Sequence, residues 1–187
     1  QQEIFELYHD LITFGTAAMF IEEDEEDLIK FSTRHIDEVY IAENDKGRID
    51  TIYRRFKLSA RAIVQKFGDK VSQDILTMEK KDPYQEIEII HAVYPRSDFD
   101  PNKKDKKNMP FESVYMEYKN KNELSVSGFK EFPFVVPRYL KASHEIYGRS
   151  PAMTALPDVK MLNEMSKTTI KAAQKQVDPP LLVPDDG

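Results

Sequence analysis

The 187-residue chain contains no cysteine. This absence excludes a disulfide framework, a zinc site with thiolate ligands and a cysteine nucleophile. No apolar run approaches the roughly 18 residues that a membrane-spanning helix needs, so we predict no membrane partner. The N-terminus also lacks the basic and then apolar pattern of a secretory signal. The chain begins without methionine and ends at Gly187 without a helix cap, and we expect both ends to be boundaries within a longer protein.

Glycine is scarce, and the six glycines do not form a phosphate-binding loop. None of them has the G-x-G-x-x-G or G-K-[ST] spacing that brings backbone N–H groups against a phosphate. The spacing of a serine nucleophile elbow is also absent. These absences exclude the commonest nucleotide sites, including that of an ATPase, and we expect no cofactor.

Histidines and acids are present, but not in the pattern of a metal or catalytic site. His9, His35, His91 and His144 lie at no ligand-like spacing from one another. We interpret His9 as an exposed helical residue and His91 as a core or interface residue on an apolar strand face. The acidic run 22–27 lacks the spacing of a calcium-binding loop. We therefore predict no metal site, no catalytic residue and no enzymatic activity; an enzyme that uses scattered carboxylates remains an alternative.

The formal net charge of −6 is unevenly distributed along the chain. Residues 1–45 carry 13 acidic and two basic side chains, whereas the remainder carries 20 acidic and 25 basic side chains. Complementary charge between subunits would explain this asymmetry, and so would a hydrated acidic loop beside an ordinary surface.

Two basic clusters are candidates for phosphate contacts. One is the lysine-rich loop 103–107, and the other contains Arg54, Arg55, Lys57 and Arg61. Neither is interleaved with stacking aromatic side chains, as a single-strand binder requires. Because the chain is also acidic overall, we interpret both clusters as hydrated surface.

Hydrophobic periodicity predicts an α+β fold. A helix is expected over 3–14 with Gly15 as its stop, and two short helices are expected at 60–67, after the N-cap Ser59, and at 72–81. The predicted strands are 16–21, 28–31, 38–42, 48–56, 86–94, 112–119 and 124–129, followed by an extended segment at 132–139. Short turns between neighbouring strands favour antiparallel pairing, and the turn 44–47 carries the strongest signal.

The character of the sequence changes after Gly148. Ser150 and Pro151 read as an N-cap followed by proline at the first helical position. Pro157 is expected to kink or restart that helix. A long helix is predicted over 158–177, about 30 Å at 1.5 Å per residue. Its apolar positions are too sparse for burial inside its own domain, so we expect it to project.

Two domains are therefore predicted. An antiparallel, strand-rich domain with short helices covers residues 1–147. Residues 148–187 hold the long projecting C-terminal helix and the start of a following segment.

Several segments resemble the portal, or head-to-tail connector, proteins of short-tailed bacteriophages. The segments that carry the resemblance are GTAAMFI at 15–21, RHIDEVYIAENDKGRIDTIYRR at 34–55, SARAIVQKFG at 59–68, HAVYPR at 91–96, YGRSPA at 147–152, ALPDVKMLN at 155–163 and DPPL at 178–181. They occur in the same order over nearly the whole chain. Family members are several hundred residues long, so the chain corresponds to a central fragment.

The resemblance implies a ring of about a dozen copies at one capsid vertex, located in the virion and assembled in the host cytoplasm. Double-stranded DNA would pass non-specifically through its channel during packaging and ejection, and terminase, capsid and tail proteins would attach to it. The strand-rich domain would be the wing, and the long helix would be a stem helix. We expect this fragment alone to be a monomer or a weak oligomer.

Two sets of residues on the long helix then become candidate functional residues. The candidates for facing the channel and DNA are Lys160, Lys167, Lys171 and Lys175. The candidates for packing between subunits are Val159, Leu162, Met165, Ile170 and Ala173. The alternative is a non-catalytic structural or adaptor domain that docks a partner through the same helix.

Overall fold

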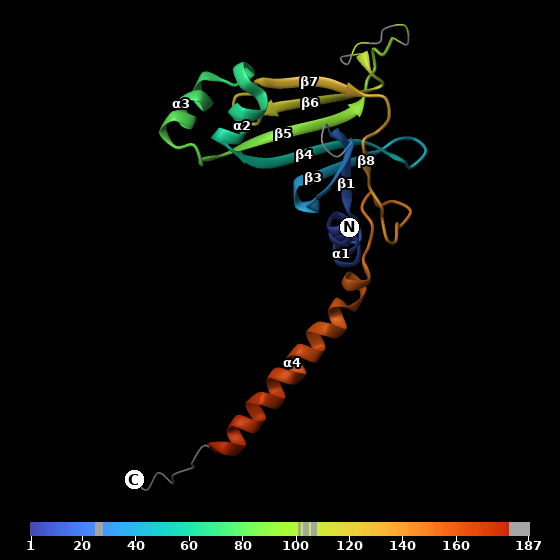
Figure 1. Ribbon diagram of the computed structural model, residues 1–187. Helices are drawn as coiled ribbons and strands as arrows, with labels where there is room; N and C mark the ends of the chain where they lie inside the picture. The colour runs from blue at the N-terminus through green and yellow to red at the C-terminus, as the bar shows by residue number, and fades with distance from the viewer. Residues whose placement is uncertain (25–27, 101, 103–104, 106–107, 180–187) are drawn as a thin grey trace.

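The segments predicted as strands pair into two antiparallel sheets in the computed structural model, which describes residues 1–24, 28–100, 102, 105 and 108–179. Short helices lie against these sheets, and one long helix projects from them (Figure 1). The helices are α1 (Gln2–Phe14), η1 (Ile36–Glu38), α2 (Ala60–Phe67), η2 (Gly68–Lys70), α3 (Gln73–Lys81) and α4 (Pro151–Val177). The strands are β1 (Ala18–Asp24), β2 (Leu28–Arg34), β3 (Val39–Glu43), β4 (Ile49–Ser59), β5 (Glu86–Pro95), β6 (Phe111–Glu117), β7 (Glu123–Phe129) and β8 (Phe134–Val135). The α+β prediction is confirmed.

The larger sheet has the strand order β3-β4-β5-β6-β7, and its inner face holds most of the core. Toward one end, Ile89 of β5 packs with residues of α2 and α3. Toward the other end, Val93 of the same strand packs with Phe20 of β1 and Phe134 of β8. Ile89 and Val93 are fully buried. Alternate residues of β5, which all point to the inner face of the larger sheet, therefore contact the short helices at one end and the smaller sheet at the other.

Alternate residues of each strand face opposite sides of the larger sheet. Tyr53 is 46% exposed, because Ile52 and Phe56 occupy the inner face of β4. On β6, the inner positions lie opposite the buried residues of β5 and are Ser113, Tyr115 and Glu117. Val114 and Met116 therefore share the outer face, where Val114 is nevertheless buried. Because the inner positions of β6 carry polar atoms, a hydrophobic pattern alone does not identify its inner face.

The smaller sheet has the order β2-β1-β8 and packs against α1. Strand β1 continues to Asp24, so the acidic loop predicted from Glu22 begins later than expected. Glu22 lies opposite Lys30 in the β1–β2 register, and this opposite-charge pair favours continued pairing. Residues 25–27 of the predicted loop, and Lys103, Lys104, Lys106 and Lys107 of the lysine-rich loop, lie outside the described residues.

Local capping signals place the helix ends where the sequence predicts them. Gly15 ends α1 with a left-handed φ of 79°. The Ser59 hydroxyl accepts a hydrogen bond from the Ala62 N–H at the start of α2. Ser150 caps α4 in the same way, with Pro151 at the first helical position.

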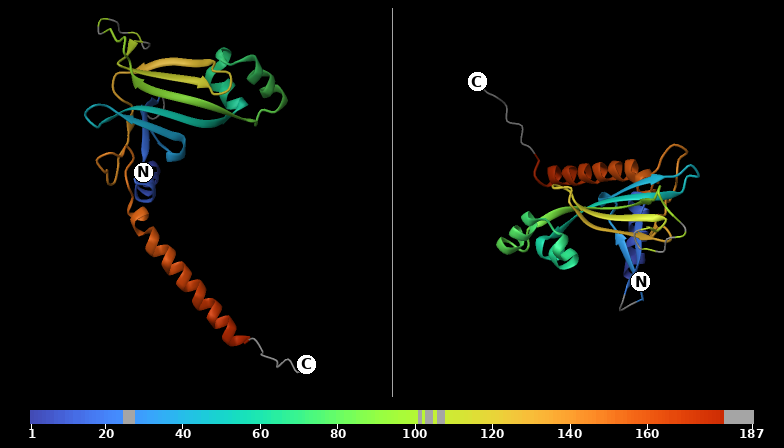
Figure 2. Two further views of the ribbon diagram at one scale, coloured as in Figure 1. Left: turned by 180° about the vertical axis from the view of Figure 1, so that it is seen from behind. Right: turned by 90° about the horizontal axis from the view of Figure 1, so that it is seen from above.

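Helix α4 leaves the sheets beside α1 and extends far from every other labelled element (Figures 1 and 2). It runs as one helix from Pro151 through Pro157 to Val177, so of the two predicted outcomes at this proline the restart does not occur. The loss of one N–H leaves the carbonyl of Met153 without its helical donor. Because Met153 is about half exposed, water can donate a hydrogen bond to that carbonyl. This hydration lowers the free-energy cost of the missing helical hydrogen bond, so the helix can continue.

Candidate functional site

The start of α4 is tied to the end of α1 by a buried hydroxyl. Ser150 is 1% exposed. Its Oγ accepts a hydrogen bond from the Met153 N–H at 2.9 Å and donates one to the Thr13 carbonyl at 2.8 Å. One side chain therefore serves as the N-cap of α4 and as a partner for a carbonyl in the last turn of α1.

Two glycines allow the backbones of these helix ends to come into direct contact. A Cβ atom built on Gly15 would lie 2.5 Å from the Gly148 carbonyl oxygen, and one built on Gly148 would overlap the Gly15 carbonyl oxygen. The Gly148 N–H donates to the buried Thr16 hydroxyl at 2.7 Å. The junction is closed by backbone packing, so it fixes the direction in which α4 departs.

The segment between β8 and α4 is held on β3 by charged and hydroxyl groups. Glu43 forms ion pairs with Arg138 and with Lys141. The Tyr147 hydroxyl accepts from the Ile41 N–H at 3.2 Å and donates to the Val39 carbonyl at 3.3 Å. These contacts anchor the chain on both sides of the bend that leads into α4.

Helix α4 itself has no buried residue. Large apolar side chains are nevertheless present along its whole length, and those between 47% and 87% exposed are Met153, Leu156, Val159, Met161, Leu162, Met165, Ile170 and Val177. The prediction that this helix is not buried in its own domain is confirmed. A row of apolar side chains on a projecting helix marks a surface for assembly.

The four candidate lysines lie on one face of α4. At about 100° per residue, Lys160, Lys167, Lys171 and Lys175 fall within an arc of about 80°. Among the described residues, one ion pair is seen on this face, between Lys167 and Glu164 at 3.2 Å. The continuous helix therefore brings together all four lysines that the sequence singled out. Of the candidate packing residues, Met165 lies on a different side of the helix from Val159, Ile170 and Ala173.

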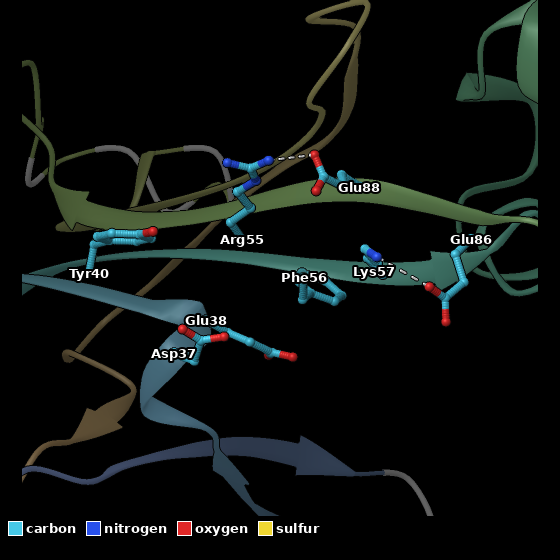
Figure 3. A pocket seen from close by; sticks show the side chains of 8 residues that line it. All are labelled: Asp37, Glu38, Tyr40, Arg55, Phe56, Lys57, Glu86 and Glu88. Carbon is cyan, nitrogen blue, oxygen red and sulfur yellow. Dashed lines mark hydrogen bonds and ion pairs between the residues drawn. The ribbon is translucent and has the colours of Figure 1, made fainter. Parts of the chain in front are cut away.

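An open groove of about 510 Å³ lies along the edge of β4, and paired charges line it (Figure 3). Arg55 pairs with Glu88 at 2.7 Å, and Lys57 pairs with Glu86 at 3.5 Å. Strand β3 pairs with β4 only as far as Arg54, so residues 55–59 form an open edge in the described part of the chain. Charged side chains along such an edge disfavour addition of another strand.

The basic cluster predicted at 54–61 is therefore largely neutralised within the chain. Arg54 pairs with Glu38 at 2.8 Å and lies 3.8 Å from the centre of the Phe56 ring. Arg55 also stacks over Tyr118 at 4.2 Å. These contacts agree with the interpretation of this cluster as ordinary surface.

His91 is a core side chain, as interpreted from the sequence. It is 2% exposed, its Nε2 lies 2.9 Å from the Ser113 hydroxyl, and its ring stacks on Tyr115 with centroids 3.9 Å apart. Burial, with the nearby cations Lys66 and Arg54, lowers the pKa of His91 to about 3. Burial also raises the pKa of Tyr115 to about 12. Both side chains are therefore neutral near pH 7.

A buried carboxylate that the sequence did not single out supports α3. Glu117 is 1% exposed, and its oxygens accept hydrogen bonds from the Ser72 N–H and from the side-chain amides of Asn120 and Asn122. It lies at the N-terminal end of α3, where a negative charge is favourable. The only sequence signal was an acidic residue at the end of an alternating strand.

Within the described residues, no group of three or more histidine or acidic side chains is arranged to hold a metal ion. No described helix has both the length and the apolar character needed to span a bilayer.

Comparison with known proteins gives a consistent family. The family profile described as bacteriophage head to tail connecting protein matches residues 1–186. The chain is 36% identical over 183 residues to the portal protein of Salmonella phage epsilon15, and 34% identical over 182 residues to the probable portal protein of Bordetella phage BPP-1. Each alignment covers 95% of this chain and 33% of the relative, so the chain spans about one third of their length. The chain belongs to the family of bacteriophage head-to-tail connecting proteins.

Proposed function

We propose that the chain is the wing and the first stem helix of a portal ring at the capsid vertex, and that its role is structural and not catalytic. In this proposal the ring holds about a dozen copies, forms the channel for DNA packaging and ejection, and is the platform for terminase, capsid and tail proteins. Assembly takes place in the host cytoplasm. Membership of the head-to-tail connector family supports a structural role in the virion. The contacts with DNA, terminase, capsid and tail proteins are proposed for the whole protein.

The observation that carries this proposal is the exposure of α4. A 27-residue helix with no buried side chain gains little stability from its own domain beyond the junction at its first turn, although most helical stability in proteins comes from packing an apolar face. Neighbouring copies in a ring would supply that packing. The rigid junction at Ser150 and Gly148 supports a fixed departure angle, which every copy in a symmetric ring must share.

The proposed domain division follows the same geometry. Residues 1–147 would form the wing, and residues 148–187 would form the stem helix with the start of the next segment. Gly148 and Ser150 lie in contact with α1, so the boundary is a closed backbone junction and not a loose linker.

The lysine face of α4 is proposed to meet the DNA channel. Four ammonium groups along one face give a weak, sequence-independent attraction to phosphates. A channel through which DNA slides needs this attraction to be weak, since many neutralised phosphates would hold the DNA in place.

Negative-stain microscopy of the full-length protein tests the ring. Rings with a central hole are expected. Discrete monomers at high protein concentration would contradict the ring and would favour the adaptor alternative, in which α4 docks on a different partner.

A further inference from the structure

Beyond its first two turns, the apolar side chains of α4 form two separate stripes. The first stripe consists of Val159, Leu162, Ile170, Ala173 and Val177. The second stripe consists of Met161, Met165 and Ala172. At about 100° per residue, the centres of the two stripes are about 125° apart around the helix. The first lies about 130° and the second about 105° from the centre of the lysine face.

The two stripes differ in shape as well as in position. The first contains branched side chains that stand out as a ridge, and Ile170 is 59% exposed. The second lines a shallow hollow of about 430 Å³, together with Glu164, Thr168 and Thr169. Methionine side chains are flexible and adapt to irregular partners. A ridge and a hollow on one helix are complementary in the sense of ridges-into-grooves packing.

A partner that covers only one stripe leaves the other in water. A different protein docked on the first stripe would leave Met161 and Met165, each 58% exposed, uncovered. A two-fold contact that pairs the first stripe with itself has the same defect. If the second stripe of one copy packs on the first stripe of its neighbour, repetition of this contact around a ring covers both stripes of every copy.

We propose that the first stripe of one copy packs on the second stripe of the next copy. This inference rests on the proposed portal function and identifies which surfaces form the stem contact. Such a contact is heterologous, and its repetition closes a ring when the rotation allows. The four lysines lie outside both stripes, and Glu164, which lines the hollow, is the ion-pair partner of Lys167, so the contact buries no unpaired ammonium group.

Disulfide cross-linking between differently tagged copies tests this pairing in the full-length protein. The 187 residues contain no cysteine, and cysteines elsewhere in the full chain are replaced by serine. One copy carries Ala173→Cys and a co-expressed copy with a larger tag carries Ala172→Cys, Met165→Cys or Met161→Cys in turn. Three partners along the second stripe allow for an axial shift between neighbouring helices. The matched control replaces the second-stripe cysteine by Lys171→Cys on the lysine face.

Oxidised rings are expected to give a covalent heterodimer with at least one second-stripe partner. Rings assembled from one cysteine variant alone should give no covalent dimer. In such rings the two cysteines lie on the same stripe of neighbouring helices and do not face each other. Because the helix axes are about 8–10 Å apart, their Cβ atoms would not come within the roughly 4.5 Å that a disulfide requires. Three outcomes would overturn the proposed pairing: a dimer from Ala173→Cys alone, a product only with the Lys171→Cys control, or no product with any second-stripe partner. None of these outcomes would contradict the proposed portal ring, since rings would still form. Absence of rings from the unmodified protein would overturn the proposed function itself.

Discussion

The hydroxyl oxygen of Ser150 lies 2.8 Å from the carbonyl oxygen of Thr13, and this contact joins the first turn of α4 to the last turn of α1. The same oxygen caps α4 through the Met153 N–H. The orientation of the projecting helix therefore depends on this small buried side chain together with the backbone packing of Gly15 and Gly148. In a ring, an error in that orientation would be repeated in every copy.

Ser150→Ala is expected to lower the free energy of unfolding by about 1–2 kcal/mol, since it removes an N-cap and leaves a buried carbonyl unpaired. It should also broaden the distance between spin labels attached at Tyr8→Cys and Lys171→Cys. Urea denaturation and electron spin resonance check the two effects. Ser72→Ala is the matched control, because Ser72 makes no side-chain cap hydrogen bond to α3. Equal losses in both variants would contradict the role of Ser150 at the junction.

The two junction glycines are needed for different reasons, and alanine variants separate them. Gly148→Ala introduces overlap with Gly15 and close contacts with Arg138 and Tyr139, without a left-handed φ, and should cost about 1–3 kcal/mol of stability. Gly15→Ala adds a left-handed φ of 79° to such an overlap and should cost more. Gly47→Ala, with φ of 70° and no contact closer than 3.5 Å, should cost only about 1 kcal/mol. Thermal or urea unfolding gives this order, and a Gly148→Ala variant as stable as the wild type would disprove the close packing.

Local signals in the sequence predicted much of this fold. The turn before Gly47, the cap Ser59 and the stop Gly15 each act within a few residues, so their structural effect can be read from the sequence. The helices and the antiparallel pairing follow from them. The four lysines and the apolar positions of α4 were identified in the same way, through helical spacing.

Contacts between distant segments could not be predicted in this way. Gly148 approaches Gly15 from more than a hundred residues away, and Glu117 of β6 supports the start of α3 from 45 residues beyond Ser72. Pro157 has the usual signal for a break, but its exposed position allows the helix to continue. That Met165 lies apart from Val159 and Ile170 already follows from helical spacing over 158–177, and the continuous helix keeps this spacing.

Glu117→Gln is expected to destabilise the chain by about 1–3 kcal/mol, because an amide nitrogen would face hydrogen-bond donors in a buried site. The Ser72 N–H and the side-chain amides of Asn120 and Asn122 all donate to this carboxylate. Urea denaturation measures the loss. The exposed Glu123→Gln on the following strand is the control and should change stability by less than about 0.5 kcal/mol. A loss of similar size in both variants would mean that the buried network contributes little.

Stability should fall as pH drops below about 6.5, and His91 should contribute to this fall. The folded-state pKa of His91 is lowered to about 3, whereas an unfolded histidine titrates near 6.5. Between these values the unfolded chain binds a proton that the folded chain does not, so stability decreases by up to about 1.4 kcal/mol for each pH unit lost. His91→Phe should flatten this dependence, and the exposed His144→Gln should not. Urea midpoints from pH 7 to pH 4 give the slopes, and identical slopes in the wild type and His91→Phe would refute this contribution.

Lys171→Gln and Lys167→Gln should reduce DNA packaging if the lysine face meets the channel, because each removes one attractive charge per copy. The matched control is Lys80→Gln, which removes one positive charge from an exposed lysine on α3, outside α4. Packaged genome length and packaging rate in the parent phage are the measurements, with ring assembly verified by microscopy for every variant. A defect relative to the wild type that shrinks at higher salt would support an electrostatic contact, since salt also screens the lysine–phosphate attraction in the wild type. Normal packaging in both lysine variants, or an equal defect in Lys80→Gln, would place the lysine face away from the DNA.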